Sequence, residues 1–267
     1  MLTLFKPKKL LDEGSTQWLF DCYAWALENF DGALFAQQTQ LILPTDQFFP
    51  DQAASPDEAA NQLLQRVLNY SAMQQWPCRA HPIANQNDIP ATPRIHIEQA
   101  LRGDQAKISV EGEGVIAVPY DPNALRQPDA LIAALAQNLA LLLSRAIATP
   151  PPGGEEYRGP ATDLLAIFLG FGLFMTNNAF NIQRGCSSCS GPSVQMMGEL
   201  TEEQMCYALA IFCQFKKIEN NKVLPHLKKS LRKLFKQARK EIQQSPQELN
   251  LLTTRLQSQL VAQGETN

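Results

Sequence analysis

The sequence lacks the features of an exported or membrane-spanning chain. Its longest apolar run, Leu164–Met175, has 12 residues and two glycines, which is too short to cross a bilayer. The N-terminus has Pro7 and several charges before Gly14, where a signal peptide would carry its apolar run. Without an export signal, the six cysteines are expected to be reduced thiols, so the sequence predicts a cytoplasmic protein with no transmembrane segment.

Signatures of nucleotide binding and of common hydrolases are also missing. Neither GFG nor GEG continues as a phosphate-binding glycine loop, and no Ser/His/Asp arrangement can be placed. The three histidines, His81, His96 and His226, fall in loop, strand edge and a basic helix, and we expect each to be structural. With a net charge of −3, the chain as a whole is not built to coat nucleic acid.

What the chain does have is enough apolar residues, 45% of 267, to bury a large core. The patterning predicts one domain over residues 1–262 and a frayed tail over 263–267. Its parts are N-terminal helices and loop (1–93), a small sheet (94–120), paired central helices (129–182) and C-terminal helices (199–262). A hairpin packed on many helices predicts an α+β fold that is predominantly helical.

Local signals place the individual elements. Gln17–Phe30 is expected to be a helix, and Ser55, Pro56 and Glu58 mark the start of another that runs to about Ala72. Trp76–Pro93 is expected to be loop because it carries four prolines. Three short strands are predicted, the last two joined as a hairpin by Glu-Gly-Glu-Gly: Arg94–Ile97, Ala106–Val110 and Val115–Val118.

Two apolar helices follow the predicted hairpin. Asp129–Ala146 reads DALIAALAQNLALLLSRA, with two amides, Gln137 and Asn138, in its middle. The second contains TDLLAIFLGFG, Thr162–Gly172, in which the aromatics belong to a core stripe at helical spacing, Phe168, Phe171 and Phe174.

This order of a hairpin, an apolar helix and a TDLLAIFLGFG helix resembles a family of uncharacterised bacterial zincin-like proteins. In them the first helix looks like LVATIAHELGHVLL and the second begins like EPLTDLLTVFLGFGIF. The resemblance covers roughly residues 40–240 and is most specific over Thr162–Gly172. It implies a zincin-like core whose small sheet precedes the former active-site helix.

The family's chemistry depends on HExxH, in which two histidines bind zinc and the glutamate is the general base. Carried over to this sequence, these positions fall on Gln137, Asn138 and Leu141. The third ligand, the glutamate of E-x-x-x-D, falls on Gly159, and only the aspartate, Asp163, is retained. The resemblance therefore implies a degenerate member without metal ligands or cofactor, a pseudo-metallopeptidase that acts by binding an unidentified protein or peptide.

This interpretation predicts where the side chain of Asp163 lies and which residue donates a hydrogen bond to it. If the resemblance holds, its carboxylate faces the first helix, where a buried charge needs a hydrogen-bond donor. We expect the donor to be Gln137, or otherwise Asn138 or Arg145.

Cysteines supply an alternative function. Cys186-Ser-Ser-Cys189 is a CxxC in a Gly/Ser-rich loop, which leaves open a thiol redox or hydrolytic enzyme. A zinc site would need two further ligands, for which Cys206 and Cys213 are the candidates, although buried free thiols suit their apolar helix. The remaining cysteines are expected to be structural, Cys22 and Cys78.

A basic block gives a second alternative. From Lys216 to Lys240 there are ten Lys/Arg against one acid, and apolar residues recur there at helical spacing. The sequence predicts a basic helix over 222–240 that is either a solvated face or a surface for nucleic acid, an anionic membrane or another anionic partner. Its candidate binding residues are Lys228, Lys229, Arg232 and Lys233.

Overall fold

The computed structural model describes residues 9–84, 88, 90–112, 114–183 and 199–264, and most of them are helical. The helices are α1 (Glu13–Asn29), α2 (Gly32–Gln37), α3 (Pro56–Tyr70), α4 (Pro128–Arg145), α5 (Arg158–Ala166), α6 (Gly172–Gln183), α7 (Glu202–Phe215), α8 (Asn220–Val223), α9 (Leu231–Gln244) and α10 (Pro246–Gly264). The strands are β1 (Cys78–Pro82), β2 (Ile95–Gln99), β3 (Ala106–Val110) and β4 (Ile116–Tyr120). The predicted α+β class, predominantly helical, is confirmed.

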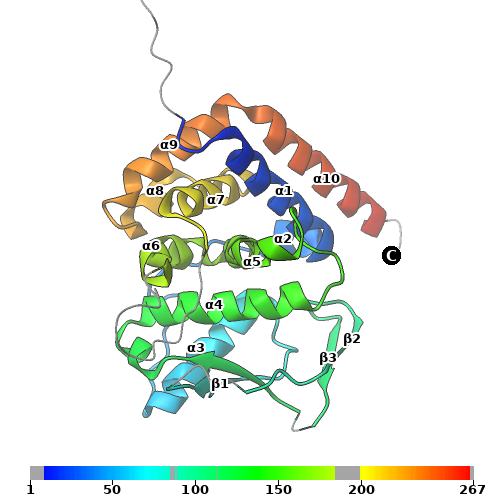
Figure 1. The fold of residues 1–267 in the computed structure, drawn as a ribbon, viewed down its shortest axis with the longest axis vertical. Coiled ribbons are helices and arrows are strands. Elements are labelled where there is room, and N and C mark those ends of the chain that lie inside the picture. Colours follow the sequence, from blue (N-terminus) through cyan, green and yellow to red (C-terminus); the bar gives the residue numbers. More distant parts are fainter. Residues whose placement is uncertain (1–8, 85–87, 89, 113, 184–198, 265–267) are drawn as a thin grey trace, which may run out of the picture.

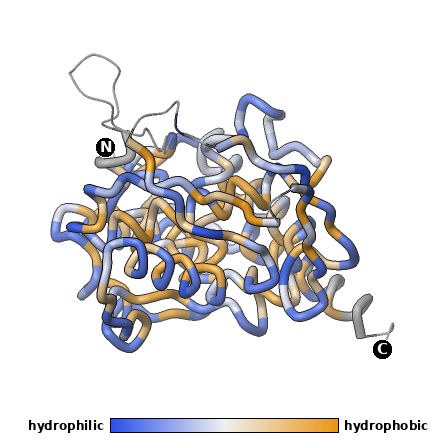
Figure 2. Tube along the Cα trace, turned by 90° about the horizontal axis from the view of Figure 1, so that it is seen from below, coloured by the Kyte–Doolittle hydropathy of each residue, from blue (hydrophilic) through white to orange (hydrophobic). Residues whose placement is uncertain are grey.

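The layers are arranged around α4, which crosses the middle of the molecule (Figure 1). On one side α4 packs against α3 and β4, and on the other against α5 and α6. Beyond these lie α7 and then α1, α9 and α10 (Figure 1). In Figure 2 the apolar segments of the chain gather in the interior and the polar segments lie around the rim.

The small sheet differs from the prediction. Instead of a hairpin across Glu-Gly-Glu-Gly, β3 pairs antiparallel with β2, while β4 pairs in parallel with β1. The expectation of loop throughout Trp76–Pro93 was therefore wrong over β1. This strand buries Cys78 and Ala80 against the core. The prolines of the stretch lie just before the strand, at its last residue and beyond it, where they leave the pairing intact.

Helix starts follow their capping residues. Ser55 accepts a hydrogen bond from the backbone N–H of Glu58 at 3.2 Å, as expected for the start of α3, which ends at Tyr70. The first helix begins at Glu13 rather than Gln17, because Asp12 caps it by accepting from the N–H of Ser15 at 2.8 Å.

The TDLLAIFLGFG segment contains a break that explains its glycines. Between α5 and α6 one π-helical turn, Ile167–Phe171, holds Gly170 at φ +106°. A Cβ there would lie 2.3 Å from the carbonyl oxygen of Gln40. The segment that contains Gln40 is held against this turn by a hydrogen bond from the Ile42 N–H to the Gly170 oxygen at 3.0 Å. A Cβ on Gly172 would lie 2.7 Å from Leu209 of α7, so both glycines allow close approach of other elements.

The same segment lies at the centre of the core. The predicted stripe of Phe168, Phe171 and Phe174 is buried. Within the described residues one helical stretch, Glu155–Ala179, is long and apolar enough to span a membrane by composition, but 89% of its most apolar window is buried inside the fold. That burial is what a core helix shows.

Candidate functional site

The two central helices run antiparallel, which brings the residues of interest together. Gln137 near the middle of α4 contacts Asp163 of α5, and the Arg158 guanidinium donates to the carbonyl oxygen of Ser144. These two contacts place Gln137 and Asp163, two of the positions that the resemblance singles out, on the facing sides of α4 and α5.

Asp163 is fully buried and is held by three donors. The Gln137 side-chain amide donates to its Oδ1 at 2.6 Å, which confirms the expected hydrogen bond. The backbone N–H groups of Glu199 and Leu200 donate to its Oδ2 at 2.7 and 3.1 Å. One carboxyl group thus joins α4, α5 and the segment that leads into α7.

The environment of Asp163 also alters its acidity. Burial raises the pKa of this carboxyl to about 7, against the lowering effect of its three hydrogen bonds. The nearby carboxylate of Glu199 raises the pKa further.

The predicted third-ligand position is filled by another residue. Gly159 has no side chain, and a Cβ built on it would lie 2.2 Å from Oε1 of Glu199. The carboxylate of Glu199 therefore occupies the space that a side chain at position 159 would enter. Sequence reasoning missed Glu199, since nothing in its local sequence points to the α5 surface.

The other predicted site residues point elsewhere. Asn138 donates to the carbonyl oxygen of Pro119 in β4 at 2.9 Å, so it joins the helix to the sheet rather than to Asp163. Leu141 is half-buried. Arg145 is exposed in the last turn of α4, and no contact with Asp163 brings it into the site.

The cysteines do not assemble a metal centre in the described part of the chain. Cys22, Cys78, Cys206 and Cys213 are buried free thiols, and burial raises the pKa of each. No group of three His, Cys, Asp or Glu side chains positioned to hold a metal occurs among the described residues. The CxxC pair, Cys186 and Cys189, lies outside them.

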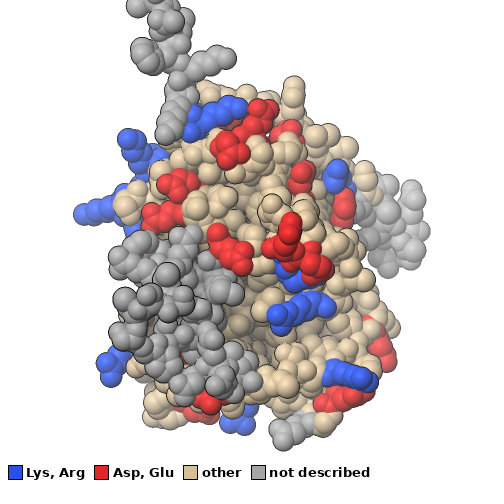
Figure 3. Space-filling view, in the orientation of Figure 1, with Lys and Arg blue, Asp and Glu red and all other residues tan. Residues whose placement is uncertain are grey.

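The basic helix over 222–240 is interrupted, which corrects the prediction of a continuous one. Pro225 lies in a 3-10 turn after α8, and the chain extends at Leu227 before α9 starts at Leu231. His226 is in that turn and is half-buried. The basic side chains of this block lie toward the edge of the molecule occupied by α8 and α9, where Figure 3 shows several Lys and Arg projecting.

The four candidate binding residues of the block are not equivalent. Lys228, Lys229 and Lys233 are exposed. Arg232 is half-buried and donates to the carbonyl oxygens of Leu227 at 2.9 Å and Pro225 at 3.3 Å. It therefore stabilises the interruption, a structural role that the charge pattern alone did not reveal.

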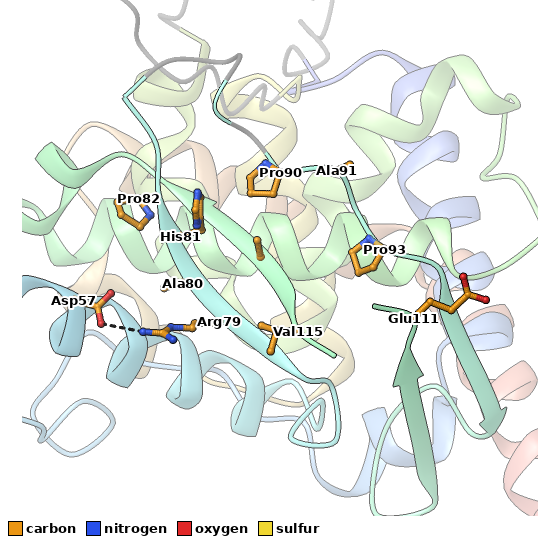
Figure 4. A pocket seen from close by; sticks show the side chains of 11 residues that line it. Asp57, Arg79, Ala80, His81, Pro82, Pro90, Ala91, Pro93, Glu111 and Val115 are labelled. Carbon is orange, nitrogen blue, oxygen red and sulfur yellow. Dashed lines mark ion pairs between the residues drawn. The ribbon is translucent and has the colours of Figure 1, made fainter. Parts of the chain in front are cut away.

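A hollow of about 520 Å³ lies over the parallel pair β1 and β4 (Figure 4). Its charged groups are already partnered: Arg79 pairs with Asp57 at 3.6 Å, and Glu111 with His96 at 3.1 Å. Figure 4 shows His81 and Glu111 pointing in different directions from different elements. This hollow therefore brings no acid and base together for catalysis.

Comparison with protein-family models, with curated proteins and with solved structures gave no match to this chain.

Proposed function

We propose that this protein is a zincin-like pseudo-metallopeptidase, in which a hydrogen-bonded polar cluster replaces the metal centre and which acts by binding a protein or peptide. The hydrogen bond from Gln137 to Asp163 carries the proposal. In the resembling family the retained aspartate is expected to orient a metal-binding histidine. Here an amide N–H takes that place on the carboxylate, at 2.6 Å.

The side chains at the remaining positions do not fit a catalytic zinc. Such a site needs about three protein ligands and an activated water. Leu141 has no donor atom, Gly159 has no side chain, and the Gln137 amide is already bonded to Asp163. Asn138 has no carboxylate to accept a proton from water, and its amide is bonded to Pro119.

A binding role in the cytoplasm agrees with the rest of the molecule. The four cysteines within the described ranges are free and buried, as in a reducing compartment. Hydrogen bonds from Gln137 to Asp163 and from Arg158 to the Ser144 oxygen join α4 and α5, so the vestigial site is part of the packed contact between these helices.

The test is to restore the missing ligands. We expect purified wild-type protein to contain no stoichiometric zinc and to show no metal-dependent peptidase activity. A variant with Gln137→His, Asn138→Glu, Leu141→His and Gly159→Glu should bind one zinc or cobalt ion. It also needs Glu199→Ala, because Glu199 fills the space beside position 159.

The matched control carries Asn138→Glu, Gly159→Glu and Glu199→Ala but keeps Gln137 and Leu141, and it should bind no metal. Zinc bound at Gln137–Leu141 in the wild type would overturn the proposal. A folded restored variant that binds no cobalt, judged by its visible absorption, would equally overturn it, since the two helices would then lack the required geometry.

A further inference from the structure

A second cavity opens next to Glu199, on the side of α5 that faces away from the sheet. It has a volume of about 440 Å³ and lies between the start of α1, the turn that precedes α5 and the segment that leads into α7. Trp18, Tyr157, Pro160 and Glu199 form its walls. This size is within the range of small-ligand sites.

Two aromatic rings are held in fixed positions in this cavity. The rings of Trp18 and Tyr157 lie 6.0 Å apart between centroids, inclined at 42°. The indole N–H of Trp18 donates to the Pro152 oxygen at 2.9 Å. Tyr157 lies against Gly153, where a Cβ would come within 2.4 Å of the ring and φ is +93°, so only glycine permits this arrangement. Both ring positions are therefore set before any ligand arrives.

Among the described residues that line the cavity, Glu199 carries the negative charge. The Gln204 side chain accepts from the N–H of Thr201 at 2.9 Å, and the Ser15 hydroxyl donates to Asp12 at 2.6 Å. Glu199 uses its backbone N–H to hold Asp163, but among the described residues no basic side chain pairs with its carboxylate. Its backbone is fixed by this hydrogen bond, and within the described ranges its carboxylate has no basic partner.

The surrounding charge favours a cation. The three segments that build the cavity, residues 12–18, 153–160 and 199–204, carry seven acidic residues and a single basic one, Arg158. That arginine is already engaged, because it donates to Glu155 at 2.7 Å and to the Ser144 oxygen. Acidic side chains over this part of the surface are visible near the middle of Figure 3.

We propose that this cavity binds an alkylammonium group, with its methyl or methylene surface against Trp18 and Tyr157 and its charge beside Glu199. Aromatic faces attract such cations through the ring quadrupole, and a carboxylate adds a direct Coulomb attraction. The proposal deepens the binding role proposed above and names the class of ligand. The ammonium can belong to a free amine or to a lysine side chain of a protein.

The experiment uses the full chain and a pair of probes that differ in charge. Choline and its neutral isostere 3,3-dimethylbutan-1-ol are titrated while the indole N–H signal of Trp18 is followed by NMR. We expect choline to shift that signal saturably and the isostere to bind at least about tenfold more weakly. Equal binding of the two probes, or no shift with choline, would overturn the proposal.

Two variants distinguish binding in this cavity from non-specific attraction of the cation by surface charge. Glu199→Gln keeps the backbone N–H that holds Asp163, so the fold is retained, and it should weaken choline binding about tenfold. Glu156→Gln removes the same charge from an exposed neighbour that does not line the cavity, and should change the affinity less than about twofold. Equal losses in both variants would contradict a specific site.

Peptides distinguish the source of the ammonium. If the ligand is a protein, a peptide with trimethyllysine should bind more tightly than choline and should lose that affinity in Glu199→Gln; if it is a small amine, the peptide should bind no better. The zinc-restoration test does not depend on either result. The proposal of an ammonium site and the proposal of a lost metal centre can therefore be disproved independently of each other.

Discussion

Gln137 and Asp163 meet across the contact between α4 and α5 at 2.6 Å, in the interior of the protein. The same carboxyl group accepts two backbone N–H groups that precede α7. Three segments that are far apart in sequence are thus joined at one side chain. Its removal is expected to affect the whole fold rather than one helix.

Asp163→Ala should lower the free energy of unfolding by about 3 kcal/mol, because it leaves an amide and two backbone N–H groups buried without an acceptor. Asp163→Asn keeps one acceptor oxygen and should cost about 1 kcal/mol. Urea denaturation measures both. A loss below about 0.5 kcal/mol for the alanine variant would show that the three donors find other partners.

The pH dependence of stability should report the same group. Burial raises the pKa of Asp163 from 3.8 to about 7, so the folded protein keeps a proton that the unfolded chain loses. Between these values the folded state binds more protons, and the contribution of Asp163 to stability therefore falls as pH rises toward 7, by a few kcal/mol in all.

The measurement compares wild type with Asp163→Asn, which cannot titrate, between pH 4.5 and 8. The stability of the wild type relative to this variant should decrease with rising pH. An increase would mean that the three donors hold the ionised carboxylate and outweigh its burial.

The sequence predicted the helices of this protein well because their signals are local. The Ser55 cap and the buried Phe168 stripe depend on residues within a few turns of each other. The contact between Gln137 and Asp163 was predicted too, although by resemblance rather than by pattern.

What the sequence did not predict depends on long-range contacts. The partner of β4 is β1, which lies far away in sequence and is too short to show a clear alternation. Glu199 reaches Gly159 only because α7 packs where it does. Arg232 looked like one of several surface charges until the interruption before α9 gave its guanidinium two carbonyl acceptors.

Gly170 offers a test of the close approach at the π-helical turn. Gly170→Ala should lower stability by about 3 kcal/mol or more, since the added carbon would lie 2.3 Å from the Gln40 oxygen and φ is +106°. Gly112→Ala is the matched control, because φ is +82° but nothing lies within 4 Å, and it should cost about 1 kcal/mol. Similar midpoints of thermal unfolding for the two variants would contradict this account.

The basic block should respond unevenly to charge reversal. Lys229→Glu and Lys233→Glu change exposed side chains and should each alter stability by less than about 0.5 kcal/mol. Arg232→Glu removes donors from two carbonyl oxygens in the turn before α9 and should cost about 1–2 kcal/mol. If all three variants changed the free energy of unfolding equally in urea denaturation, Arg232 would have no more structural role than the exposed lysines.

The lysine variants also separate structure from binding, because they leave the fold intact. If the block is only a solvated face, neither should change retention on vesicles that contain anionic lipid or on a nucleic-acid column. Retention that falls with added salt and is lost in Lys229→Glu and Lys233→Glu would instead establish an anionic partner, since salt screens such contacts and charge reversal removes them. Arg232→Lys keeps the charge but not the paired donor geometry of the guanidinium. It should therefore retain any such binding while it loses stability. If the surface binds nothing and Arg232 is purely structural, this variant should lose stability and show no retention in either assay.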